Sequence, residues 1–123
     1  MDVDFYKPKT SLGTNIHCLT LTDSFFRKNK IDSTKRSLLK NFLTFNGIPI
    51  QYMDQVHGRS IEKVDCHTTF AKSETDGLLS SSFDLALGVL SADCMPIAIS
   101  KKDGNEFAVV HAGWKGLFNG VIE

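Results

Sequence analysis

Two β-strand candidates joined by an Asp-Gly turn constrain the fold of this chain most. Residues 95–100 and 106–111 are rich in β-forming apolar side chains, and Asp103-Gly104 between them is a strong hairpin signal. Just upstream, residues 85–90 are continuously apolar, which is typical of a strand buried on both faces of a sheet. The last third of the chain is therefore predicted to form a sheet with residues 85–90 as its central strand.

The first half of the chain adds strands and a helix. Three further segments rich in β-formers are predicted strands: residues 15–22, 50–56 and 60–64. Residues 31–46 are predicted to be helical, because their apolar side chains lie mostly on one face and Gly47 can supply the left-handed residue that follows a helix. The polar residues 66–75 indicate a loop, and a second helix is expected after His111. These elements predict an α+β fold, a mixed β-sheet with flanking helices, in a single domain over residues 1–123.

Composition narrows the partners and the compartment. The chain of 123 residues has 14 basic and 14 acidic side chains, so its charge gives no reason to expect nucleic acid or an anionic membrane as a partner. No apolar run approaches the ~20 residues that span a bilayer, and the N-terminus lacks the apolar core of a secretory signal. Three cysteines, an odd number, favour free thiols in a reducing compartment. The expected location is the cytoplasm.

Three short strings place a metal-binding side chain beside a turn-forming residue at the end of a predicted strand. They are Gln-Val-His-Gly around His57, Ala-Asp-Cys-Met-Pro around Cys94, and His-Ala-Gly-Trp from His111. Two imidazoles and one thiolate suit zinc, and three protein ligands leave a fourth position open for water or substrate. Spacing alone leaves other interpretations open. Such histidines are often ordinary surface groups, and Cys94 with His111 could instead be a nucleophile and base oriented by Asp93.

The three strings, in this order, resemble the YfiH family, also described as the laccase-domain or polyphenol oxidase family and as the peptidoglycan editing factor family. The resemblance runs from about Arg36 to the C-terminus and includes Asp76-Gly-Leu-Leu, which is similar to a strand of the family. It implies a metal site, usually zinc, formed by His57, Cys94 and His111. It also implies phosphorolysis of adenosine, inosine and methylthioadenosine, together with adenosine deamination. Members are about twice as long as this chain, which has an apolar pair just before its last residue and no helix stop signal, so we expect an incomplete domain that is the front portion of a longer protein.

The resemblance suggests roles for individual residues. In deamination, the open position of the zinc would hold the water that attacks the purine ring, with Asp93 as an acid, a base or an orienting group. Phosphorolysis needs cations for phosphate, for which Arg36 and Lys115 are the candidates. Arg36 resembles the arginine of a family Asn-Arg pair, although Lys35 precedes it here.

Three alternatives remain at this point. Cys94 could be the nucleophile of a metal-independent amidase that edits peptidoglycan. A copper ion could replace zinc and oxidise polyphenols, since a His/His/Cys set also suits copper. Finally, the chain could be an inactive metal-binding fragment that self-associates as a homo-oligomer through exposed apolar surface.

Overall fold

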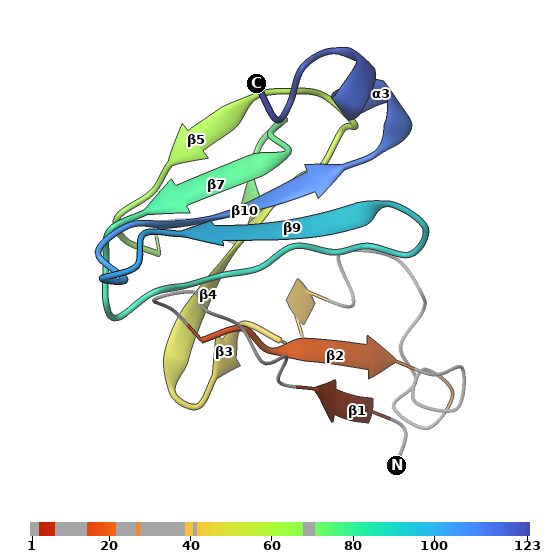
Figure 1. The fold of residues 1–123 in the computed structure, drawn as a ribbon. Helices are drawn as coiled ribbons and strands as arrows, with labels where there is room; N and C mark the ends of the chain where they lie inside the picture. The colour runs from red at the N-terminus through yellow and green to blue at the C-terminus, as the bar shows by residue number, and fades with distance from the viewer. Residues whose placement is uncertain (1–2, 7–14, 22–26, 28–38, 41, 68–70) are drawn as a thin grey trace.

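The computed structural model describes residues 3–6, 15–21, 27, 39–40, 42–67 and 71–123 (Figure 1). The strands in this part of the chain are β1 (Val3–Tyr6), β2 (Cys18–Leu21), β3 (Thr44–Phe45), β4 (Ile48–Met53), β5 (Ile61–Lys63), β6 (Ala71–Lys72), β7 (Gly77–Ser80), β8 (Ala86–Leu87), β9 (Met95–Ser100) and β10 (Phe107–Ala112). The helix α3 (Trp114–Phe118) follows β10 directly. No helix in these described ranges is long and apolar enough to cross a membrane.

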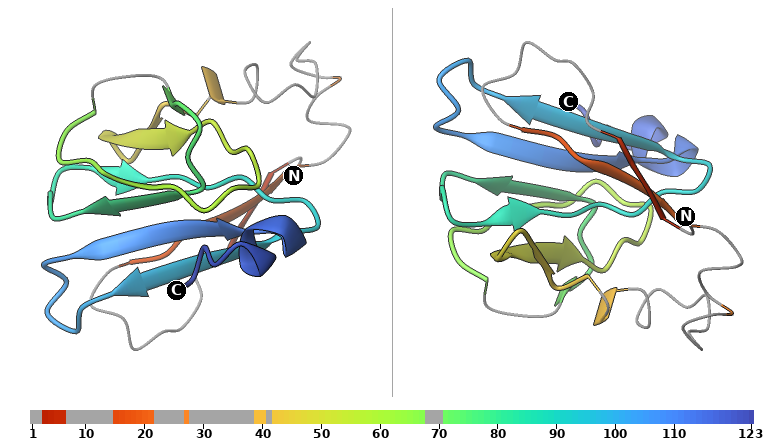
Figure 2. Two further views of the ribbon diagram at one scale, coloured as in Figure 1. Left: turned by 90° about the horizontal axis from the view of Figure 1, so that it is seen from above. Right: turned by 90° about the horizontal axis from the view of Figure 1, so that it is seen from below.

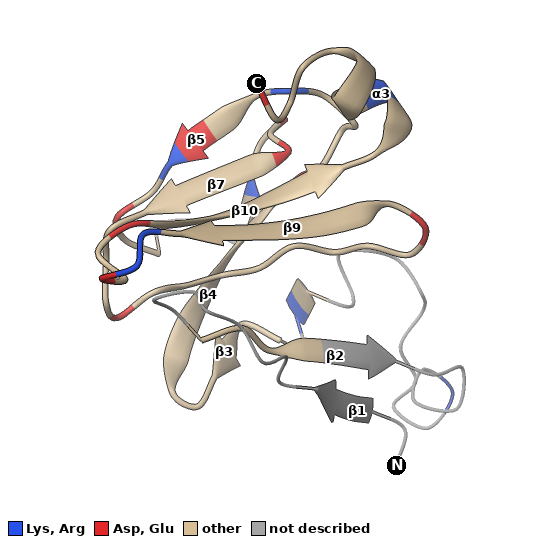
Figure 3. Cartoon of the chain, in the orientation of Figure 1, with Lys and Arg blue, Asp and Glu red and all other residues tan. Residues whose placement is uncertain are grey.

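The main sheet has four strands in the order β5-β7-β10-β9. β5 pairs with β7 in parallel, whereas β7–β10 and β10–β9 are antiparallel, so the sheet is mixed and the predicted α+β class is confirmed. β9 and β10 form the predicted hairpin, and their register pairs Ala112 with Met95. This register brings Cys94, the residue before β9, beside the end of β10 that carries His111. None of β7, β9 and β10 contains a Lys, Arg, Asp or Glu residue (Figure 3).

A second sheet contains β3, β4 and β6, with β8 paired to β4. In Figure 1, β4 crosses behind β9 and β10, and β3 lies below them. The prediction of a helix to residue 46 is wrong at its end, because Thr44 and Phe45 form β3. Asn46 and Gly47 both have positive φ values, 51° and 77°, as a tight hairpin turn between twisted strands requires. Pairing of β3 with β4 therefore prevails over the helical pattern. Leu39 and Lys40 are helical, Phe42 and Leu43 are not, and residues 31–38 and 41 lie outside the described residues.

Two other predicted elements also differ from the structure. The apolar segment 85–90 is not a central strand: only β8 forms, and it pairs on one side with β4. Its hydrophobicity reflects packing, because buried Leu85 joins Met53, Val64 and Leu78 in one core cluster. The predicted loop over residues 66–75 contains the two-residue strand β6, which pairs in parallel with β4.

Helix α3 lies beside the end of β10, as both views in Figure 2 show. A second core cluster here contains Val110, Ala112 and Val121. Gly116 of α3 packs so closely on the loop after β4 that a Cβ atom at this position would lie 2.9 Å from the carbonyl oxygen of Gly58. This contact positions α3 against the loop that carries His57.

Candidate metal centre

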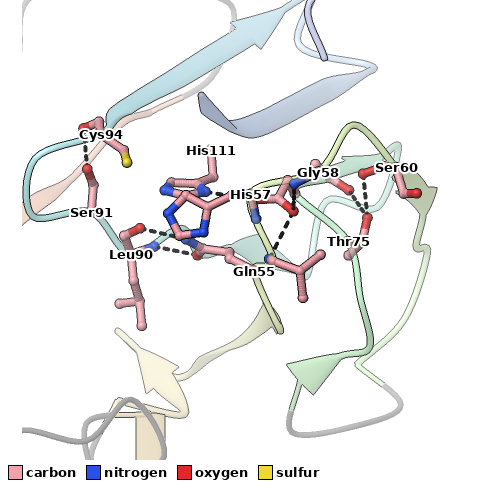
Figure 4. Close-up of polar contacts among 12 residues, drawn as sticks. Gln55, His57, Gly58, Ser60, Thr75, Leu90, Ser91, Cys94 and His111 are labelled. Carbon is pink, nitrogen blue, oxygen red and sulfur yellow. Dashed lines mark hydrogen bonds and ion pairs between the residues drawn. The ribbon is translucent and has the colours of Figure 1, made fainter. Parts of the chain in front are cut away.

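Three segments that are distant in sequence bring His57, Cys94 and His111 together. His57 lies in the loop after β4, Cys94 lies directly before β9, and His111 lies on β10. One ligand atom from each residue can be chosen so that all three lie within 4.8 Å of one another. The two imidazole rings meet edge to face with centroids 4.9 Å apart, and the Cys94 sulfur points toward them (Figure 4). The predicted grouping of these residues is thus what the structure contains.

The three side chains differ in burial, which gives the group an open side. His111 is buried, Cys94 is half-buried and His57 is exposed. All three cysteines of the chain are free thiols, so Cys94 is available as a ligand. A group with two nitrogen donors and one sulfur donor, open on one side, could hold a metal ion and leave it a free coordination position.

Asp76, directly before β7, connects two of the three candidate ligands through one buried carboxylate. Its Oδ2 atom lies 2.7 Å from Nδ1 of His111, and both side chains are almost fully buried. The same carboxylate accepts hydrogen bonds from three successive backbone N–H groups, those of Val56, His57 and Gly58, at 2.9–3.0 Å. Asp76 therefore holds the ring of one ligand and the backbone of another.

The backbone at His57 is in an uncommon conformation. Its φ is 60°, in the left-handed region that a residue with a Cβ atom adopts only at a cost of roughly 1–2 kcal/mol. This conformation points consecutive N–H groups at one anion, so the bonds to Asp76 offset the cost. Burial raises the pKa of the Asp76 carboxyl, but the hydrogen bonds from His111 and from the three N–H groups together outweigh burial and lower that pKa. Asp76 is thus held as a carboxylate.

Gln55 ties the Cys94 segment to the His57 loop. Its Nε2 donates to the carbonyl oxygen of Leu90 at 2.7 Å, and its Oε1 accepts from the N–H of Leu90 at 2.9 Å (Figure 4). Between Leu90 and the ligand, the Ser91 hydroxyl donates to the Cys94 carbonyl oxygen. The Gln-Val-His string therefore serves two purposes: it supplies a ligand and it anchors the segment of another ligand.

Asp93 lies beside Cys94, as expected, with its Oδ1 atom 3.8 Å from the sulfur. Burial raises the pKa of the Cys94 thiol, and the negative charge of Asp93 raises it further. A free nucleophilic cysteine needs the opposite shift, toward a stable thiolate. The environment of Cys94 therefore does not favour a metal-free nucleophile, and as a metal ligand the thiol would likewise have to lose its proton on binding.

Gly113 forms a tight wall of the site. A Cβ atom at this position would lie 3.1 Å from Sγ of Cys94 and 3.1 Å from Cδ2 of His57. Space beside two of the ligands thus exists only because residue 113 has no side chain. The glycine of the His-Ala-Gly-Trp string has a steric role in the site as well as a role in the turn.

Two other predicted site residues, Lys115 and Arg36, are not among the groups that the structure brings together here. Lys115 is exposed on α3, with its ammonium 5.6 Å from the centre of the Trp114 ring. Arg36 lies outside the described residues. Asp76 and the clamp made by Gln55 were not predicted as parts of the site. An acidic residue directly before the apolar segment that forms β7 was the signal available for Asp76.

Comparison with known proteins gives a consistent result. Residues 27–123 match the sequence model of a family described as multi-copper polyphenol oxidoreductase laccase. A protein named purine nucleoside phosphorylase from Rickettsia conorii is 36% identical over 98 residues, which cover 78% of this chain and 40% of that protein. The protein named purine nucleoside phosphorylase YfiH from Shigella flexneri is 36% identical over 72 residues, 58% of this chain and 29% of that protein. The chain thus matches less than half the length of these relatives.

Solved structures share the fold. Protein NMB0706 of Neisseria meningitidis, from the family called DUF152, superimposes with a TM-score of 0.66 at 20% identity, over 96% of this chain and 54% of that one. The YfiH protein of Bacillus licheniformis superimposes with a TM-score of 0.54 at 28% identity, over 70% of this chain and 35% of that one.

Proposed function

Because the chain belongs to the YfiH family, whose sequence model is described as multi-copper polyphenol oxidoreductase laccase, we propose that it carries the zinc centre of an enzyme acting on purine nucleosides. The reactions are phosphorolysis of adenosine, inosine and methylthioadenosine, and deamination of adenosine. The observation that carries the proposal is the convergence of His57, Cys94 and His111 on one point. The reducing cytoplasm is the matching compartment, since it keeps Cys94 in the thiol form.

The donor set and its surroundings fit a metal ion. His111 presents Nε2 to the group because Nδ1 is already bonded to Asp76, and ligating histidines commonly have such a carboxylate partner. His57, Cys94 and His111 would hold the ion, and a bound zinc ion would supply Lewis acidity. The copper alternative uses the same three ligands, and metal analysis separates the two.

The chain's own groups take complementary roles in this proposal. Asp93 is the proposed proton donor or acceptor for the substrate, because it is exposed and lies next to Cys94. Lys115 and Arg36 are the proposed cations for phosphate. The matched segment spans less than half the length of the relatives that bear the phosphorylase name, and these reactions are proposed from that segment alone.

The test combines metal analysis with turnover. Protein purified without added metal is expected to contain about one zinc per chain, and C94S is expected to lose it, whereas C66S, which changes an exposed cysteine, keeps it. Each nucleoside is then incubated with and without phosphate, and bases and inosine are separated by chromatography. Release of free base that requires phosphate supports phosphorolysis, and conversion of adenosine to inosine supports deamination.

The same samples discriminate between the alternatives. If the protein contains stoichiometric zinc but forms no product from any nucleoside, this chain is not an enzyme for these reactions. That result would favour the alternative of an inactive metal-binding fragment. Copper in place of zinc, with oxidation of a phenol, favours the polyphenol oxidase alternative. Amidase activity that survives metal chelation but is lost when Cys94 is alkylated favours the thiol amidase.

A further inference from the structure

We propose that Asp76 is the positioning residue of the metal centre, setting the ring of His111 and the loop of His57 through one carboxylate. The inference rests on the metal binding proposed above. It adds that the geometry of the site depends on a residue that is not itself a ligand. Two independent sets of contacts support it, one to a side chain and one to the backbone.

The side-chain contact determines which nitrogen of His111 is free. Asp76 Oδ2 and His111 Nδ1 are 2.7 Å apart, and the Asp76 and His111 side chains are 0% and 4% exposed, so water does not compete for the bond. A carboxylate can only accept, so Nδ1 must carry the proton. In the neutral ring, Nε2 then has its lone pair free. The bond therefore selects the tautomer that can bind a metal and fixes the plane of the ring.

The backbone contacts set the position of His57. The N–H groups of Val56 and Gly58 both donate to Oδ1, at 3.0 and 2.9 Å, and the N–H of His57 donates to Oδ2 at 3.0 Å. Without the Asp76 carboxylate, these three N–H groups would have no acceptor, and nothing would offset the free-energy cost of the left-handed φ of His57. The loop would relax and move its imidazole relative to His111.

Asp76→Asn separates positioning from bulk, because the two side chains have nearly the same shape. The amide oxygen can still accept from Val56 and Gly58, but its NH₂ group then faces the N–H of His57 and Nδ1 of His111. An NH₂ group next to Nδ1 favours the tautomer with the proton on Nε2, where it blocks coordination. The change therefore disturbs both ligands while removing little volume.

The experiment titrates metal-free wild type, D76N and S80A with Co²⁺, following the thiolate-to-cobalt charge-transfer band in competition with a chromophoric chelator. S80A is the matched control, because Ser80 is a buried polar residue on β7, the strand that Asp76 directly precedes, and in its described bonds its hydroxyl accepts only from the nearby N–H of Ser82. D76N is expected to bind Co²⁺ about 10- to 100-fold more weakly than wild type. S80A is expected to stay within about twofold. Urea unfolding of each metal-free protein shows how much of each variant is folded.

A measurement on the wild type alone covers the case in which D76N does not fold. Long-range ¹H–¹⁵N spectra of the metal-free protein, with ring signals assigned by single His→Gln variants, report which nitrogen of His111 carries the proton. We expect the proton on Nδ1. Folded D76N that binds Co²⁺ as tightly as wild type, or a His111 proton on Nε2, would overturn the inference. Wild type that binds no metal would instead refute the proposed function, and the tautomer would still test the role of Asp76.

Discussion

Replacing Gly113 by alanine tests whether the space between Cys94 and His57 is needed for a metal ion. The backbone of Gly113 has φ −86° and ψ 170°, which alanine adopts without strain. The new methyl group, however, would lie 3.1 Å from Sγ of Cys94 and from Cδ2 of His57. The substitution therefore acts on the two ligands and leaves the backbone free to keep its conformation.

The size of the effect follows from these distances. Non-bonded carbon contacts are most favourable at about 3.5–4.0 Å, so each of the two ligands must move away by about half an ångström. Metal–ligand distances tolerate only about 0.2 Å, so the site loses its best geometry. We expect metal affinity to fall about tenfold, which corresponds to about 1.4 kcal/mol. The free energy of unfolding of the metal-free protein should stay level or rise by about 0.4–1 kcal/mol, because alanine lowers the entropy of the unfolded chain.

Gly88→Ala is the control, because it should affect stability and not metal affinity. A Cβ atom there would lie 2.5 Å from Cε1 of Tyr52 and 2.9 Å from Cγ2 of Ile50, which overpacks the core at a cost of about 1–3 kcal/mol. Urea unfolding and Co²⁺ titration of both variants should give opposite patterns: G88A loses stability and G113A loses affinity. If G113A binds Co²⁺ like wild type, these residues do not enclose the ion and the reasoning fails.

Two further predictions concern a support of the site and a tyrosine of the core. Gln55→Leu removes both hydrogen bonds to Leu90. It should lower the free energy of unfolding by about 1–3 kcal/mol and weaken Co²⁺ binding, as measured by urea unfolding and Co²⁺ titration. Unchanged Co²⁺ affinity would show that the two bonds of Gln55 do not position Cys94. For Tyr52, which donates to the Phe42 carbonyl oxygen at 2.6 Å, burial raises the pKa to about 12. Because the unfolded phenol ionises near pH ~10, wild type should lose up to about 2 kcal/mol relative to Y52F as the pH rises from about 10 to about 12, and parallel stability curves in urea would contradict this.

The elements that the sequence predicted well are those whose patterns are local. Residues 95–100 form β9 with the predicted bounds, and the Asp103-Gly104 signal marks a real hairpin. The prediction of a central strand over residues 85–90 was wrong because an apolar run looks the same in sequence whether it pairs with a strand on each side or packs as a partly buried connection. Asn46-Gly47 shows the same limit, since one left-handed glycine can end a helix or, with an asparagine before it, close a hairpin.

The sequence by itself determined which residues could meet at a metal: two imidazoles and a thiolate, each beside a strand end. Only the tertiary structure decided how they are held. The role of Asp76 depends on the start of β7 lying against the loop after β4 and against β10, segments about twenty and thirty-five residues away along the chain. A hydrogen bond at such separations leaves no periodicity or spacing in the sequence, because it is created by the pairing of strands and not by neighbouring residues.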